Sequence, residues 1–197
     1  MQIRILDRFS TDLDEVALES PQSTFYHTGV WVESLSRVYS GMKFRCLVAE
    51  EGGRVLGYLP FFVIRRGPTR ALWSLPFGTY GGPVGGDDVR AKLLAKYSAL
   101  RRGWGVREVG LVDYSNTVTD GVFDIDQSAT HVLDLTEGFE SIWDGRFDKS
   151  KRRPARKARR EGLSVVEAGS VTDVGDYYAI YDERSRQWGQ RGTLRSR

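Results

Sequence analysis

The strongest constraint on the fold is a pair of strand-like runs in residues 43–65, KFRCLVAEEGGRVLGYLPFFVIR. Phe44 and Cys46 alternate with Lys43 and Arg45, and this period of two is typical of a strand. Gly52 and Gly53 stand between the two runs, and a glycine pair in that position predicts a tight hairpin. We therefore expect two antiparallel strands here.

Further strand and helix patterns accompany this hairpin. Strands are predicted at residues 2–6, 71–76, 106–114, 130–135 and 163–168, and helices at residues 10–19, 28–39, 87–102, 138–147 and 171–188. Trp31, Leu35 and Val38 are expected to form the buried stripe of the second of these helices. Because consecutive strands are followed by a helix and another strand, we predict a mixed α/β sheet with helices on its faces.

Composition excludes several kinds of chemistry. The chain has 197 residues, of which 40% are hydrophobic, enough for one domain and part of a second. Cys46 is the single cysteine, so neither an internal disulfide nor a cysteine-based metal site is expected. His27 and His131 are the two histidines, and no GxSxG, HExxH or CxxC motif occurs. No metal site is predicted.

The two ends of the chain bear on its location and completeness. The N-terminal MQIRILDRFSTDLDEV is charged and lacks the apolar core of a signal peptide. No apolar run reaches the ~20 residues that a membrane span needs. We therefore expect no membrane span and a cytoplasmic protein. Residues 189–197 are polar and unpatterned, as in a chain that stops early.

The positive charge is concentrated in residues 148–161. This segment holds eight basic and two acidic residues of a chain with formal net charge +3, so the remainder has more acidic than basic residues. Pro154 favours the first turn of a helix, which predicts a start near Arg153 and an end at Gly162. Three interpretations stay open, namely a solvated helix face, contact with nucleic acid, or a specific phosphate site. No aromatic residue lies within 148–163, which disfavours binding of single strands by base stacking.

Two glycine-rich segments need separate interpretations. FGTYGGPVGG, residues 77–86, joins a predicted strand to a predicted helix. It is either a flexible connection or a loop whose backbone approaches a substrate, and without a lysine it is no P-loop. LRRGWGV, residues 100–106, resembles the pyrophosphate loop of acetyl-CoA-dependent N-acetyltransferases. We exclude that role because the segment leads from a helix into a strand, where no helix N-terminus meets an anion.

Four segments together resemble the Fem-type peptidoglycan bridge-forming aminoacyltransferases and the wider FemAB-like acyltransferases of the GNAT superfamily. They are STFYHTGVW at 23–31, LVAEEGGRVLGYLPFF at 47–62, LWSLPFGTYGGPVG at 72–85 and SIWDGRFDKSKRRPARKARREGLSV at 141–165. The resemblance covers nearly the whole chain.

The resemblance implies a fold and a domain plan. It implies a GNAT-like (acyl-CoA N-acyltransferase) mixed sheet flanked by helices in residues 1–147. A basic connecting helix follows at 148–162, and residues 163–197 are the incomplete start of a second GNAT-like subdomain.

The resemblance also implies a function. Such proteins transfer an acyl or aminoacyl group to an amine of a cell-wall or surface-polymer precursor. No bound cofactor is expected; acyl-CoA or aminoacyl-tRNA is the expected donor, and a phosphorylated or nucleotide-linked molecule the acceptor. Ser150 replaces a family lysine, and Pro154 replaces a residue able to donate a hydrogen bond. These departures favour an acceptor other than a muropeptide.

The predicted substrate-binding residues are Arg152, Arg156, Lys149, Lys151, Phe77, Tyr80, Gly81, Gly82 and Trp31. Among them, Arg152 matches the family arginine that is associated with acceptor phosphates. No catalytic residue is identified, because positioning suffices for an already reactive acyl group. If a base takes part, Asp113, Tyr80 and His27 are the candidates.

Two alternatives belong to other functional classes. One is a non-catalytic fragment with a scaffolding role, and the other is a nucleic-acid (tRNA) binding module that uses the basic run. If the acyl-donor half is missing, the isolated chain is expected to lack transferase activity. The sheet edge left open would then favour self-association.

Overall fold

A computed structural model of the chain divides it into two units, Met1–Ser128 and Ala129–Arg197. The described residues are 1–103, 105–114, 118 and 123–189. Residues 190–197, the end of the predicted second subdomain, lie outside them. The predicted plan of a first subdomain, a connecting helix and the start of a second subdomain stays a prediction.

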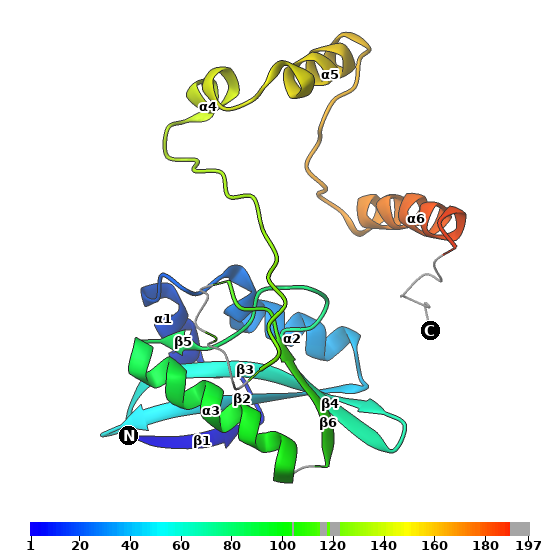
Figure 1. The fold of residues 1–197 in the computed structure, drawn as a ribbon. Helices are drawn as coiled ribbons and strands as arrows, with labels where there is room; N and C mark the ends of the chain where they lie inside the picture. The colour runs from blue at the N-terminus through cyan, green and yellow to red at the C-terminus, as the bar shows by residue number, and fades with distance from the viewer. Residues whose placement is uncertain (104, 115–117, 119–122, 190–197) are drawn as a thin grey trace. The chain divides into compact units, whose positions relative to one another are not determined.

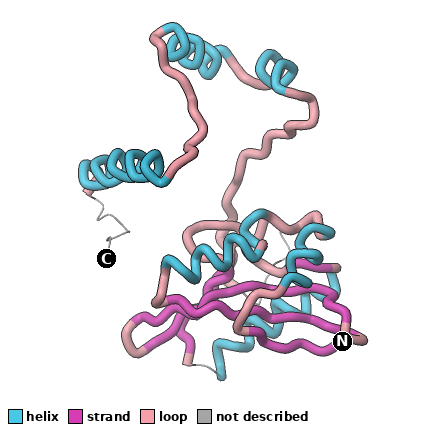
Figure 2. The backbone as a smooth tube through the Cα atoms, turned by 180° about the vertical axis from the view of Figure 1, so that it is seen from behind, coloured by secondary structure: helices cyan, strands magenta, loops and turns pink. Residues whose placement is uncertain are grey.

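The first unit is built on a mixed six-stranded sheet, which Figure 2 shows from behind. Its strands are β1 (Gln2–Leu6), β2 (Met42–Glu51), β3 (Arg54–Arg66), β4 (Thr69–Ser74), β5 (Val84–Gly85) and β6 (Val106–Leu111). The order is β1-β2-β3-β4-β6, and the short β5, inside the segment predicted as a loop, pairs with β3. β4 and β6 run parallel, whereas the other pairs are antiparallel. The predicted mixed α/β sheet is confirmed.

A two-residue turn joins β2 to β3. Gly52 and Gly53 have φ values of 58° and 82°. Two consecutive positive φ angles fit a type I′ turn, which glycine adopts without a steric penalty. Glu51 pairs with Arg54 across this turn, so the predicted hairpin is confirmed.

Helices cover both faces of the sheet (Figure 1). They are α1 (Thr11–Glu19), the 3-10 helix η1 (Phe25–His27), α2 (Gly29–Val38) and α3 (Asp87–Gly103). Phe44 and Cys46 of β2 belong to the core shared with α1 and α2, whereas Leu47 and Ala49 belong to the core shared with α3. Because successive strand side chains point to opposite faces, the part of a strand that is covered on both sides is apolar, as residues 46–49 of β2 are.

The buried stripe of α2 differs from the predicted one. Val32 and Leu35 are buried, whereas Val38 in the last turn is 57% exposed. The inward face thus includes Val32 and excludes Val38. Trp31 is half-buried and packs against the aromatic rings of η1 instead of lying in the centre of the core.

The second unit contains the helices α4 (Phe139–Gly145), α5 (Lys149–Arg160) and α6 (Val171–Gln187). The strands predicted at residues 130–135 and 163–168 are wrong, because neither segment is a strand. Their apolar side chains are exposed, including Val132 at 72% and Val166 at 82%. A short apolar run forms a stable strand only where other strands and a core support it. The described residues of this unit supply no pairing strand.

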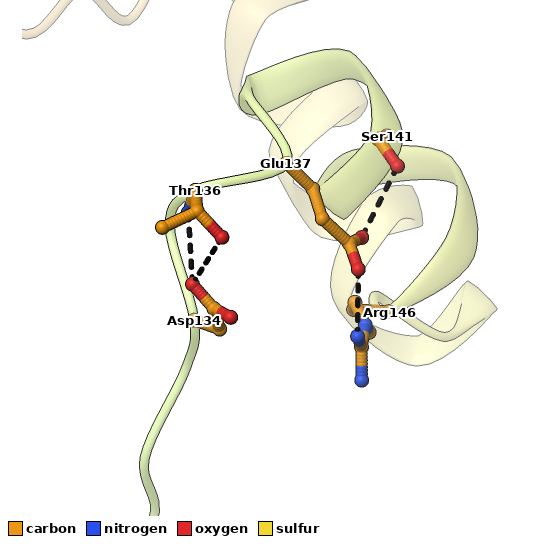
Figure 3. A network of polar contacts seen from close by, with 5 residues as sticks. All are labelled: Asp134, Thr136, Glu137, Ser141 and Arg146. Carbon is orange, nitrogen blue, oxygen red and sulfur yellow. Dashed lines mark hydrogen bonds and ion pairs between the residues drawn. The ribbon is translucent and has the colours of Figure 1, made fainter.

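Hydrogen bonds and an ion pair between polar side chains fix the residues that precede α4 (Figure 3). Asp134 accepts hydrogen bonds from the backbone N–H of Thr136 at 2.9 Å and from its hydroxyl at 2.7 Å. Glu137 precedes the helix and accepts hydrogen bonds from Ser141 at 3.2 Å and from Arg146 at 3.0 Å. The contact with Arg146 lowers the pKa of Glu137. This ion pair joins the residues on either side of α4.

α5 begins earlier than predicted. The Asp148 carboxylate accepts hydrogen bonds from the N–H groups of Ser150 at 2.7 Å and Lys151 at 3.2 Å. Because these bonds satisfy donors of the first turn, the helix starts well before Arg153 and places Pro154 in its interior. The predicted start, which rested on the proline alone, is wrong.

The end of α5 agrees with the prediction. Gly162 follows the helix with φ 81° and donates its N–H to the carbonyl oxygen of Arg159 at 3.2 Å. Leu163 donates its N–H to the carbonyl oxygen of Ala158 at 3.0 Å. This pair of bonds is a Schellman motif with Gly162 at the position after the cap.

α6 confirms the helix predicted over residues 171–188. The Ser170 hydroxyl accepts the N–H of Asp173 at 3.2 Å, and the Asp173 carboxylate accepts the N–H of Ser170 at 2.9 Å. This reciprocal capping box fixes the start of the helix. Neither α6 nor any other helix of the described residues combines the length and apolar character needed to cross a membrane.

The cap of α5 gives a first testable prediction. Asp148→Ala is expected to destabilise the helix start, because two backbone donors lose their acceptor. Faster hydrogen exchange at the amides of Ser150 and Lys151 measures this loss. Asp148→Asn is the matched control, since asparagine caps about as well. Equal exchange in the alanine variant and the wild type would contradict the prediction.

Candidate functional site

The segment that follows β4 is held against the sheet by Ser74. Its buried hydroxyl donates to the carbonyl oxygen of Pro60 at 2.7 Å and accepts the N–H of Gly82 at 2.9 Å. Gly81 forms a parallel bridge with Asp113, just beyond β6. The loop between β4 and α3 is thus fixed at the carboxyl ends of the parallel strands β4 and β6.

The same loop contains two strained residues. Leu75 and Phe77 have φ values of 54° and 72°, which residues with a side chain rarely adopt. Such a conformation costs on the order of 1–3 kcal/mol and is concentrated at ligand sites. Leu75 is buried, and the Phe77 ring packs 4.8 Å from that of Tyr39. Of the two predicted interpretations, the fixed and strained loop favours a binding segment over a flexible connection.

A continuous set of aromatic rings meets this loop. We call Phe25, Tyr26, Trp31, Tyr80 and Tyr114 the aromatic row. The centroid distances are 6.0 Å for Phe25–Trp31, 5.2 Å for Tyr26–Trp31, 6.2 Å for Tyr26–Tyr80 and 5.1 Å for Tyr80–Tyr114. The planes of these pairs differ by 55° to 67°, so the rings are tilted against one another. The aromatic row brings together η1, α2, the loop and the end of β6.

His27 connects η1 to the loop. It is 1% exposed, and its Nδ1 accepts the backbone N–H of Thr24 at 3.1 Å. Burial lowers the pKa of His27 to about 4, although hydrogen bonding with the backbone of Gly82 and Gly81 opposes this effect. The imidazole is therefore neutral at pH 7 and is a weak base. No group of three or more metal-ligating side chains surrounds it or occurs elsewhere in the described part of the chain.

Asp113 places a carboxylate beside the aromatic row. It is half-buried and immediately precedes Tyr114. Its Oδ2 accepts the N–H of Val118 at 3.1 Å, and a Cβ at Gly82 would lie 3.4 Å from its Oδ1. Its negative charge acts on His27. Of the three predicted base candidates, Asp113 is a half-buried carboxylate, whereas His27 is buried and holds the loop.

Arg90 lies buried in the first turns of α3, where the loop ends. Its Nη2 donates to Asp87 at 2.6 Å, and its side chain is 10% exposed. Nε and Nη1 are buried without a hydrogen-bond partner in the described residues. Free guanidinium N–H groups and a helix N-terminus both favour an anion.

The cations predicted to bind phosphate lie in the second unit. An open hollow of about 720 Å³ on α5 is lined by Lys149, Arg152, Arg153, Arg156, Arg159 and Arg160. Because one helix supplies all six side chains, the hollow is a surface feature and not an enclosed cavity. The Arg152 side chain contacts Asp144 at 3.3 Å and is 23% exposed, so this ion pair helps to hold it in place.

The structure brings part of the predicted set together. Trp31 and Tyr80 belong to the aromatic row, and Gly81 and Gly82 anchor the loop that carries Tyr80. Phe77 instead packs on Tyr39. Lys149, Arg152 and Arg156 line the hollow on α5, whereas Lys151 is not among its lining residues. The roles of all these residues in binding a substrate stay predictions.

Several residues of the site are not predicted from the sequence. Tyr26 stands inside the segment STFYHTGVW, and Tyr114 follows a predicted strand, but nothing local indicates that their rings approach that of Tyr80. Ser74 was detectable as the polar residue in the apolar run LWSLP. In the sequence Arg90 looks like an ordinary solvated helix residue, and only the structure shows that it is buried.

Comparison with known proteins gives similarity at the level of structure. No protein-family model matches the sequence, and no curated protein matches it. The chain is similar to FemX with 13% identity and a TM-score of 0.41, over 52% of this chain and 25% of FemX. It thus spans about a quarter of that protein. It is also similar to a ribosomal-protein-alanine N-acetyltransferase from Brucella melitensis biovar Abortus 2308, with 12% identity and a TM-score of 0.44 over 68% of this chain and 99% of that one. A protein from Thermus thermophilus aligns with 17% identity and a TM-score of 0.40, over 67% and 97% of the two chains.

Proposed function

We propose that the chain supplies the acceptor-binding part of an N-acyltransferase of the FemAB type, which transfers an acyl or aminoacyl group to an amine of a cell-wall or surface-polymer precursor. One observation carries the proposal. The loop after β4 is strained, fixed by Ser74 and flanked by the aromatic row at the carboxyl ends of β4 and β6. In open α/β sheets, ligands bind outside the carboxyl ends of the strands.

The proposed reaction depends mainly on positioning. The amine nitrogen attacks the carbonyl carbon of an activated ester or thioester, from aminoacyl-tRNA or acyl-CoA. An N–C bond forms, the C–O or C–S bond breaks, and a proton of the amine passes to the leaving group. Holding the two reactants together supplies a large share of the rate enhancement. Asp113 can accept a hydrogen bond from the amine, while the neutral His27 keeps the loop in place.

The proposed phosphate contacts come from two places, each considered within its own unit. In the second unit, Arg152 and Arg156 line the hollow on α5 and would bind acceptor phosphates. A guanidinium group suits this role because it donates two parallel hydrogen bonds to one phosphate. In the first unit, the unpartnered N–H groups of Arg90 would hold an anionic group of the acceptor.

Binding of a nucleotide sugar tests this function. Arg152→Gln is expected to weaken the binding of a uridine diphosphate sugar at least tenfold, because a hydrogen bond to a charged group contributes about 1.5–3 kcal/mol. Calorimetry at constant salt measures the change. Arg186→Gln is the matched control, since Arg186 is an exposed arginine of α6 that pairs with Asp182. Equal binding by wild type and Arg152→Gln would refute the assignment of Arg152.

A second candidate function, binding of single-stranded nucleic acid, has one specific observation in its favour. Phe139, Trp143 and Phe147 form a ladder with centroid distances of 5.7 Å and 5.6 Å. This ladder precedes the cations of α5 directly, and the Arg152–Asp144 pair joins the two helices. Aromatic rings beside cations are typical of single-strand binding. A steep fall of affinity with salt, with a slope that grows with the number of phosphates, would favour this alternative.

A further inference from the structure

We propose that the aromatic row and Asp113 form a binding site for an alkylammonium cation. The proposal rests on the proposed function in one respect only: if that function is correct, the cation is a group of the acceptor. The site itself is defined by residues of the first unit alone. It names a chemical class of ligand for the loop after β4.

The first support is the arrangement of the rings. Tyr80 lies between Tyr26 and Tyr114, at centroid distances of 6.2 Å and 5.1 Å, with planes that differ by 55° and 56°. Tilted rings present faces in several directions, which is how aromatic side chains enclose a cation. Tyr114 is 44% exposed and Phe25 is 58% exposed, so ring surface is open to a ligand. A connected aromatic surface of this kind commonly marks a binding site.

The second support is the charge at the site. Asp113 adds a carboxylate at the Tyr114 end of the aromatic row, and the neighbouring His27 contributes no positive charge at pH 7. A cation is attracted by this carboxylate and by the ring faces together, whereas a phosphate is repelled by the carboxylate.

The third support is an unused donor. The Nε1 atom of Trp31 is buried and has no hydrogen-bond partner in the described residues. A buried donor without an acceptor is unfavourable. An oxygen of the ligand would satisfy it, so the preferred ligand carries a hydroxyl or carbonyl oxygen near its ammonium group. Choline and ethanolamine have this combination.

The experiment compares choline with 3,3-dimethylbutan-1-ol, its uncharged carbon analogue of the same shape, on the chain of residues 1–197. The indole N–H resonance of Trp31, assigned with a Trp31→Phe variant, reports binding by NMR titration. Choline is expected to shift this resonance and to bind at least fivefold more tightly than the alcohol, because the cation–π and ionic attractions are absent from the alcohol. Equal affinity of the two ligands, or no shift with either, overturns the proposal.

Variants separate the cation site from general effects on folding. Tyr80→Leu and Asp113→Asn are expected to weaken choline binding roughly fivefold to thirtyfold, whereas Tyr80→Phe retains it. Tyr177→Leu, at an exposed tyrosine of α6, is the matched control and is expected to change nothing. Uridine is the third ligand: if it displaces choline and binds as tightly, the aromatic row is a nucleobase site and the proposal is wrong.

The outcomes for the two proposals are distinguishable. If choline binds as described but Arg152→Gln leaves nucleotide-sugar binding unchanged, the cation site stands and the assignment of Arg152 in the proposed function fails. If nucleotide-sugar binding depends on Arg152 while choline does not bind, the cation site fails and the proposed function stands.

Discussion

Gly81→Ala is expected to lower the free energy of unfolding of the first unit by about 3 kcal/mol. A Cβ at this position would lie 2.5 Å from the carbonyl oxygen of Ser74 and 2.6 Å from its hydroxyl oxygen. Ser74 is buried and bonded to Pro60, so it cannot move aside without losing that bond. The loop must therefore shift away, which breaks its bridge to Asp113.

Gly86→Ala in the same segment is the matched control. A Cβ at Gly86 would meet no atom within 4 Å, and its φ lies outside the left-handed region. Because Gly86 caps α3, its replacement is expected to cost no more than about 1 kcal/mol. Thermal unfolding measures both variants: we expect a fall in Tm of roughly 10 °C for Gly81→Ala and a few degrees for the control. Equal shifts would contradict the close approach at Gly81.

The elements that sequence reasoning predicted correctly depend on local signals. The β2–β3 hairpin follows from alternation around Gly52 and Gly53, and α3 follows from apolar side chains at helical spacing. The strands predicted at 130–135 and 163–168 also contain short apolar runs but are not strands. Whether an apolar run becomes a strand depends on a partner strand elsewhere in the chain, and periodicity carries no information about that partner.

The start of α5 shows a competition between two local signals. Pro154 predicts a helix start near Arg153, since proline fits best in a first turn. Asp148 predicts an earlier start, since its carboxylate caps two N–H groups. The helix starts at the Asp148 cap even though an interior proline removes one helix hydrogen bond and crowds the preceding turn. Local signals of this kind conflict here, and the sequence alone does not decide between them.

The candidate site was only partly predictable. The sequence predicts Tyr80, Gly81 and Gly82, because a tyrosine among glycines is unusual in a segment that serves only as a connection. Tyr26 and Tyr114 come from segments far from Tyr80 in sequence, and their approach depends on the parallel pairing of β4 and β6. The strain in the loop cannot be predicted either, because nothing in the sequence indicates that non-glycine residues there adopt positive φ angles.

His27 is expected to make the first unit less stable in mild acid. Its pKa is about 4 in the folded chain, below the ordinary value of 6.5, because burial disfavours the charged imidazolium. Between these pH values the unfolded chain binds a proton that the folded chain does not. The contribution of His27 is therefore complete above pH 6.5 and is lost as the pH falls toward 4. For this group alone, the free energy of unfolding should decrease by about 2 kcal/mol between pH 7 and pH 5.

Denaturant unfolding of wild type and His27→Gln at pH 7 and pH 5 measures this effect. Glutamine keeps an acceptor for the N–H of Thr24 but has no proton to gain, so the variant is expected to lose most of the pH dependence. The matched control is His131→Gln, because His131 is exposed and its replacement should leave the profile unchanged. Carboxylates such as Glu50, whose pKa is lowered from 4.5 by Arg4, titrate below this window. If wild type and His27→Gln lose stability equally between pH 7 and pH 5, His27 is not the buried neutral link between η1 and the loop.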